Sequence, residues 1–101
     1  MKNITSRQRA YLRGMAQKIS PIIQIGKNGV TPDVTQAVSD ALEAREIVKI
    51  SILKNCFDAP MDIADILSER TRSDIVQVIG RKITLYRKAK KEENVKIVLP
   101  K

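Results

Sequence analysis

The sequence predicts an α/β domain with a two-layer architecture, in which helices pack on a mixed four-stranded sheet in the order α-β-α-β-α-β-β. Apolar residues repeat at helical spacing over residues 32–44. They alternate with polar residues over Ile47–Leu53, which is typical of a strand with one buried face. Near the C-terminal end, Gly80-Arg81 separates two apolar runs and favours a tight type II′ hairpin turn.

The N-terminal third predicts a helix followed by a short strand. The capping-box sequence Thr5-Ser6-Arg7-Gln8 begins the helix, which we expect to end at about Lys18 or Ile19. Its apolar face, which we expect to contact the core, consists of Tyr11, Leu12, Met15, Ala16 and Ile19. Ser20-Pro21 then ends the helix, and Ile22–Ile25 predicts a short buried strand.

The rest of the chain continues this alternation. Beyond the helix at 32–44, whose outward acids we expect to form a solvated face, a third helix is predicted over about Pro60–Arg70. The remaining strands are predicted over Ile47–Leu53, Ile75–Ile79 and Lys82–Arg87. Two βαβ units imply parallel strand pairs with right-handed crossovers, and the final hairpin adds an antiparallel strand. In the basic tail, residues 88–101, we expect a flexible charge run and then an apolar segment that adds a short strand or docks loosely.

Charge is strongly segregated along the 101 residues, whose net charge is +8. Residues 1–32 carry six basic and no acidic residues, and residues 75–101 carry eight basic and two acidic ones. Residues 33–74 carry nine acidic and five basic residues. Basic ends around an acidic middle favour one positive face, as nucleic-acid-binding proteins have. The alternative is a solvated basic surface without a partner.

Several kinds of chemistry are missing from the sequence. It has no histidine and a single cysteine, Cys56, which excludes histidine-dependent catalysis and thiolate zinc sites. We therefore expect no enzyme, no catalytic residue, no metal, no cofactor and no small-molecule substrate. With neither a signal peptide nor a membrane span in the pattern, we expect a cytoplasmic protein without a membrane partner. Only three aromatic residues are present, which favours phosphate and sugar contacts over base stacking.

The most informative motif is the loop Gly26-Lys27-Asn28-Gly29, between the predicted strand and the helix start Thr31-Pro32. Glycines allow close approach to a ligand, a helix N-terminus favours an anion, and Lys27 adds a positive charge. The loop is thus a candidate phosphate-contacting site. The alternative is an ordinary turn in which the glycines only solve the geometry. A KH domain also uses GxxG, but between two helices, whereas an apolar run precedes the loop here.

Several segments together resemble the CRM domain, the chloroplast RNA splicing and ribosome maturation module, and in particular its stand-alone bacterial YhbY-type members. These segments are Leu12-Arg13-Gly14, Ile25–Thr31, Leu42–Lys49, Glu69-Arg70-Thr71, Val76–Lys82 and Leu85-Tyr86-Arg87. The resemblance covers about residues 4–87 and implies a fold like the C-terminal domain of translation initiation factor three. Two departures are Thr71-Arg72-Ser73, where many members have Thr-Gly, and Asn28, which replaces a frequent glycine.

The resemblance also implies that this chain binds RNA and associates with precursors of the large ribosomal subunit. We expect residues 1–87 to form a single CRM-like RNA-binding domain that acts as a monomeric assembly factor on structured ribosomal RNA. The residues expected to contact RNA are Gly26, Lys27, Asn28 and Gly29 of the loop, Arg7, Arg9, Arg13 and Lys18 of the first helix and, more weakly, Lys49, Arg81 and Lys82. We expect the first helix and the loop to form one phosphate-clamping surface.

Other functions fit the residues less well. The first helix is basic and amphipathic, so the chain could be an interaction module that docks on an acidic protein partner or an anionic membrane without direct RNA binding. Its modest apolar face is needed for the core, which speaks against this. A DNA-binding module would need a recognition helix, and the best-formed helix is acidic on its outer face.

Overall fold

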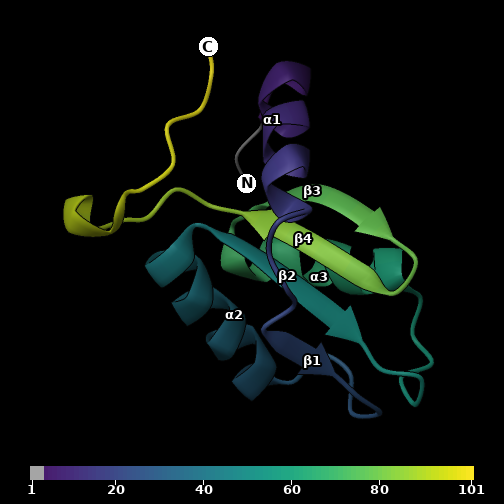
Figure 1. The fold of residues 1–101 in the computed structure, drawn as a ribbon. Coiled ribbons are helices and arrows are strands. Elements are labelled where there is room, and N and C mark those ends of the chain that lie inside the picture. The colour runs from purple at the N-terminus through teal and green to yellow at the C-terminus, as the bar shows by residue number, and fades with distance from the viewer. Residues whose placement is uncertain (1–3) are drawn as a thin grey trace.

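The computed structural model describes residues 4–101 and confirms the predicted α/β architecture with a mixed four-stranded sheet (Figure 1). The helices are α1 (Ser6–Ala16), α2 (Pro32–Arg45) and α3 (Pro60–Thr71). The strands are β1 (Ile23–Ile25), β2 (Ile47–Ile52), β3 (Asp74–Ile79) and β4 (Lys82–Tyr86), and a short 3-10 helix, η1 (Glu92–Asn94), follows them. No helix in the described part of the chain has the length and apolarity needed to cross a membrane.

The strand order in the sheet is β1-β2-β4-β3. Strands β1 and β2 are parallel, as the first βαβ unit predicts, whereas β4 runs antiparallel to both β2 and β3. The expected second parallel pair is wrong, because β4 folds back between β2 and β3. Pairing of Ile79 with Lys82 leaves Gly80-Arg81 as a two-residue turn. Gly80 has φ +57°, the positive value that the first central position of a type II′ turn requires.

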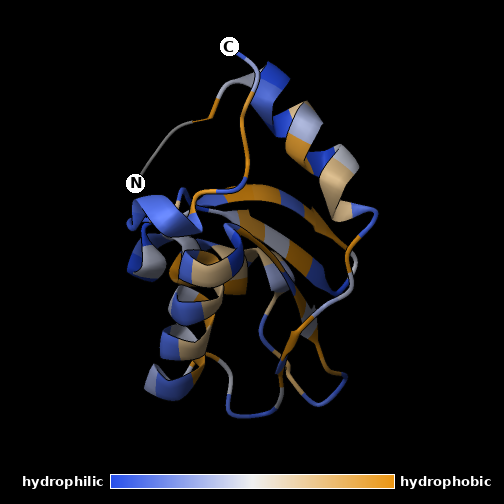
Figure 2. Cartoon of the chain, turned by 60° about the vertical axis from the view of Figure 1, so that its left-hand side comes forward, coloured by the Kyte–Doolittle hydropathy of each residue, from blue (hydrophilic) through white to orange (hydrophobic). Residues whose placement is uncertain are grey.

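Helices α2 and α3 cover one face of the sheet, and their apolar sides turn toward it (Figures 1 and 2). The alternation in β2 sends Val48, Ile50 and Ile52 into this main core. The other face carries a smaller cluster beneath α1, formed by Leu12, Ile47, Val76 and Tyr86. Both sides of the sheet are therefore used, and α1 stands apart from the other two helices.

Helix α1 begins where the sequence predicts, but its last residue and the exposure of Tyr11 differ from the prediction. The Thr5 hydroxyl accepts from the Gln8 N–H at 3.1 Å, and the Gln8 side chain accepts from the Thr5 N–H, which completes the capping box. The helix ends at Ala16, earlier than expected, because the chain tightens into three-residue turns. Tyr11 is 47% exposed, so the expectation that it contacts the core is wrong.

The turn after α3 contains a left-handed residue where the resemblance leads us to expect glycine. Arg72 has φ 57° and ψ 46°, a conformation that glycine adopts without steric cost. The Ser73 N–H donates to the Ser68 carbonyl at 2.9 Å and closes the helix end. This departure thus changes the residue in the turn and leaves a left-handed helix end.

The C-terminal tail is held by a buried carboxylate, contrary to the expectation of a flexible charge run. The Glu46 side chain is fully buried at the end of α2. It accepts hydrogen bonds from the backbone N–H groups of Ala89 (2.8 Å), Lys96 (2.7 Å) and Ile97 (2.8 Å). Of the two arrangements expected for the last apolar segment, the chain adopts docking: Ile97 and Leu99 pack against the cluster beneath α1 without forming a strand.

A second carboxylate reinforces this attachment. Glu43, which we placed on a solvated face, accepts from the backbone N–H groups of Lys90 (2.8 Å) and Lys91 (3.1 Å). It also accepts from the Asn94 side chain at 3.0 Å. These bonds lower the pKa of Glu43 from 4.5 to about 2, and the bond from Asn94 contributes most to this shift. Burial alone would raise the pKa of Glu46, but its three backbone donors outweigh this and lower it.

The attachment of the tail is expected to weaken as the pH becomes acidic. A carboxylate whose pKa is lowered in the folded protein stabilises it fully above its ordinary pKa, and this contribution is lost as the pH falls through the lowered value. For Glu43 the loss spans pH 4.5 to about 2. We expect the NMR resonances of the Lys90 and Lys91 amides to shift over this range, and the Glu43→Gln variant to abolish that transition. Resonances that stay constant down to pH of about 2 would contradict the role of Glu43.

Candidate nucleic-acid interface

The GxxG loop, residues 26–29, forms a tight turn between β1 and the start of α2. The Gly29 N–H donates to the Gly26 carbonyl at 3.0 Å, and the Thr31 hydroxyl caps α2 by accepting from the Val34 N–H. Gly29 has φ +66°, and a Cβ there would lie only 3.0 Å from Oδ2 of Asp58, so both the backbone conformation and the space favour glycine. The side chains of Lys27 and Asn28 are exposed at the tip. The turn therefore explains Gly29 structurally and leaves the two central side chains available to a ligand.

Two further loops lie beside the GxxG loop. The segment between β2 and α3 is joined to β1 by the Leu53 N–H, which donates to the Ile25 carbonyl at 2.8 Å. From the β3–β4 turn, the Arg81 guanidinium donates to the carbonyls of Leu53 (2.6 Å) and Cys56 (2.8 Å), and also to that of Ile52. We call this group of three loops, residues 26–29, 53–59 and 80–82, the loop end of the sheet (Figure 1).

The loop end carries four exposed basic residues, Lys27, Lys54, Arg81 and Lys82. Sequence reasoning missed Lys54, because nothing local indicates that its loop packs beside the GxxG loop. Arg81 was expected to contact RNA, and its guanidinium holds the neighbouring loop through three backbone carbonyls. Lys49, another expected contact, is half-buried and its ammonium donates to the Ala16 carbonyl at 2.9 Å at the end of α1. Both of these residues thus have a structural role in the fold.

The basic residues of α1 lie away from the loop end, and Lys18, expected in this helix, lies in the turn after it. Arg7, Arg13 and Lys18 are exposed, whereas Arg9 is half-buried and donates from Nε to the Ile75 carbonyl at 3.2 Å. Figure 1 shows α1 at one end of the sheet and the GxxG loop beyond the opposite end. The structure therefore separates the expected residues into two cationic regions in place of one continuous surface.

A short row of polar side chains lies on the sheet face at the edge of the loop end. Gln24, Ser51 and Lys82 are paired across β1, β2 and β4. Their neighbours along β1 and β2 face α2 and α3, so these three lie on the opposite side of the sheet. This row crosses the sheet next to the loop end and is reached from the same side as α1.

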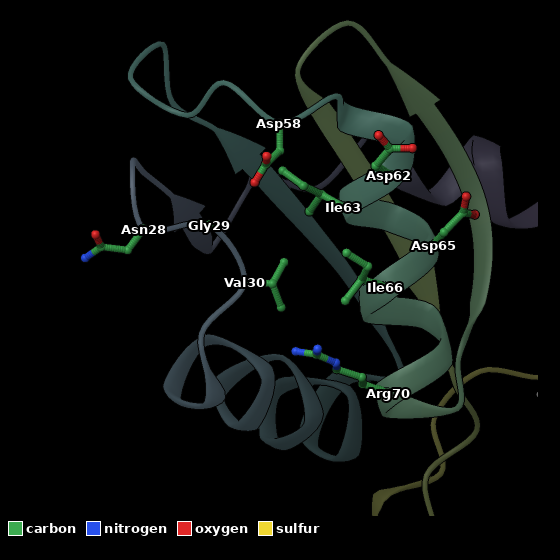
Figure 3. Close-up of a pocket in the computed structure, with 9 residues that line it drawn as sticks. All are labelled: Asn28, Gly29, Val30, Asp58, Asp62, Ile63, Asp65, Ile66 and Arg70. Atoms are coloured by element: carbon green, nitrogen blue, oxygen red, sulfur yellow. The ribbon is translucent and has the colours of Figure 1, made fainter.

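The opposite side of the GxxG loop is acidic. A cavity of about 600 Å³ lies between the loop and α3 (Figure 3). It is lined by Asn28, Gly29, Val30, Asp58, Asp62, Ile63, Asp65, Ile66 and Arg70. Three carboxylates against one guanidinium make it unfavourable for a phosphate. They also form no metal centre, because within residues 4–101 no group of three or more acidic, cysteine or histidine side chains is arranged to hold an ion.

Comparison with known proteins identifies a matching family and several similar proteins. The family model described as the CRS1/YhbY (CRM) domain matches residues 4–87. Probable RNA-binding protein YqeI from Bacillus subtilis (strain 168) is 42% identical over 97 residues, which cover 96% of this chain and 99% of that protein. A protein from Haemophilus influenzae named RNA-binding protein is 29% identical over 101 residues, which cover 100% and 99% of the two chains.

A solved structure agrees with these relatives. The solution structure of the hypothetical protein SAV1595 from Staphylococcus aureus, described as a candidate RNA-binding protein, superposes with a TM-score of 0.78. It is 43% identical, and the match covers 97% of this chain and 100% of that one. Family match, relatives and fold point the same way: the chain belongs to the CRS1/YhbY (CRM) domain family.

Proposed function

We propose that this protein binds structured ribosomal RNA and acts as an assembly factor for the large ribosomal subunit. Membership of the CRM family and the names of its relatives support RNA as the ligand. The observation that carries the proposal is the GxxG loop itself, whose tip exposes Lys27 and Asn28 beside the other cations of the loop end. The family, the relatives and this loop give no support to an enzymatic function.

In this proposal the RNA backbone contacts two places on the protein. Lys27, Lys54 and Lys82 bind phosphates of one RNA segment at the loop end. The polar row formed by Gln24, Ser51 and Lys82 faces the same RNA segment. Arg7 and Arg13 of α1, with Lys18 in the turn that follows it, bind a second part of the RNA. The acidic cavity on the α3 side repels phosphates, so the RNA lies along the sheet face. Because the loop end and α1 belong to the same folded domain, binding at both would hold two segments of the RNA at a fixed distance from each other. This arrangement would persist while ribosomal proteins bind.

The dependence of affinity on salt tests the electrostatic part of this proposal. Neutralising about five phosphates should give a slope of roughly −4 for log affinity against log salt concentration, at 0.7–0.9 per contact. We would measure binding of a fluorescently labelled transcript of large-subunit ribosomal RNA at several salt concentrations. A slope near zero would contradict phosphate clamping.

Sedimentation tests the ribosomal part. A tagged copy in cell lysate should migrate with precursors of the large subunit on a sucrose gradient at low salt and leave them at high salt. If the protein stays at the top of the gradient at both salt concentrations while the purified protein still binds RNA, the ribosomal target is wrong and RNA binding stands.

A further inference from the structure

The loop between β2 and α3 exposes an aromatic ring at the loop end. The Phe57 side chain is 93% exposed, the largest value among the large apolar side chains of residues 4–101. Single exposed apolar residues are common on protein surfaces, so exposure alone indicates nothing. Phe57 differs from other exposed apolar residues in two ways: it lies close to the GxxG loop, and the backbone before it is anchored.

Phe57 lies between two residues whose side chains lie close to the GxxG loop. On its N-terminal side, Asn55 approaches Gly26, where a Cβ would lie 3.4 Å from Oδ1 of Asn55. On its C-terminal side, Oδ2 of Asp58 would lie 3.0 Å from a Cβ on Gly29. Because Asn55 and Asp58 both lie close to the turn that carries Lys27, Phe57 belongs to the same small region of surface.

The backbone next to Phe57 is firmly held. Cys56 is buried, its N–H donates to the Leu53 carbonyl at 3.0 Å, and its carbonyl accepts from the Arg81 guanidinium at 2.8 Å. The chain therefore anchors the preceding residue and leaves the ring in solvent. Because the backbone before Phe57 is already held, a ligand that binds the ring has only the side chain of this segment left to order.

We propose that Phe57 stacks on an unpaired base of the RNA whose phosphates contact Lys27 and Lys54. This inference rests on the proposed RNA binding and adds to it a preference for RNA with an unpaired nucleotide, in a loop or bulge, over a continuous duplex. Unpaired bases expose a π-face that aromatic side chains recognise. Of the chain's other two aromatic residues, Tyr86 is buried and Tyr11 lies on α1, so Phe57 provides the stacking surface at the loop end.

Fluorescence provides a direct test because the chain contains no tryptophan. The Phe57→Trp variant carries a single indole at the proposed stacking position. We expect a stem-loop RNA to quench its emission, and a blunt duplex of the same stem to leave it nearly unchanged. Ile66→Trp serves as a matched control, because Ile66 is 39% exposed and lines the acidic cavity on the α3 side, away from the proposed RNA path. Its emission should not respond to either RNA.

Affinity measurements complete the test. Phe57→Ala is expected to weaken binding of the stem-loop by about 5- to 150-fold and to leave the salt slope unchanged, because stacking involves no counterion release. Phe57→Tyr should retain the affinity. Unchanged indole emission of Phe57→Trp at saturating stem-loop, with unchanged affinity of Phe57→Ala, would overturn stacking and leave RNA binding intact. If the unaltered protein binds neither RNA, both the stacking and the proposed function are wrong.

Discussion

Replacing Glu46 with glutamine is expected to lower the free energy of unfolding by about 2–3 kcal/mol. The buried carboxylate accepts three backbone N–H groups of the tail. An amide of the same size can accept from one side only, and its NH2 group would face an N–H donor without an acceptor. Thermal unfolding followed by circular dichroism should show a fall in Tm of roughly 10 °C or more for a domain of this size.

A matched substitution and a truncation separate this effect from a general loss of charge. Glu93→Gln removes the same charge from an exposed side chain and should change stability by less than about 0.5 kcal/mol. In a chain shortened to end at Lys88, Glu46 has no tail to hold, and Glu46→Gln should then cost little. A loss of equal size in the full and shortened chains would show that Glu46 stabilises α2 and not the tail.

Replacing Lys27 with glutamate is expected to weaken RNA binding by about tenfold or more at low salt and to reduce the magnitude of the salt slope by about 1. The substitution removes one phosphate contact and adds a repulsive charge at the tip of the GxxG loop. Lys27 is exposed and its side chain has no hydrogen-bond partner within the described residues, so Tm should not fall. Fluorescence anisotropy with labelled ribosomal RNA and thermal unfolding would measure the two quantities.

Lys88→Glu is the control for this experiment. It makes the same change of charge at an exposed position just after β4, at the end of that strand opposite the loop end, and should leave most of the affinity. If Lys27→Glu lowers affinity and Tm together, the loop is structural and the turn alone explains its glycines. If both variants weaken binding equally, net charge accounts for the effect and the loop has no special role.

Local patterns predicted the elements well, because each depends on residues close in sequence. The capping box at Thr5, the periodicity of α2 and the glycine turn at Gly80 all involve contacts within a few residues. The insertion of β4 between β2 and β3 could not be predicted in this way, since it depends on which strands pair. The role of Glu46 was equally hidden, because its partners lie 43 to 51 residues away.

The candidate site shows the same division. The GxxG loop was found because its glycines and its lysine are consecutive. Lys54 and Phe57 were missed because their loop reaches the site through tertiary contacts. Lys49 and Arg81 were chosen for their charge, and nothing local predicts that backbone carbonyls bind them. The distance between α1 and the loop end likewise follows from packing across the sheet.

The anchoring of α1 has a consequence for how RNA could be selected. The helix is attached near its start by Gln8, which donates to the Pro100 carbonyl, along its length by Arg9, and at its end by Lys49. The spacing between the two cationic regions is therefore set before any ligand arrives. An RNA that contacts both would need phosphates already at that spacing, so the protein would measure a distance in the folded RNA rather than read its base sequence.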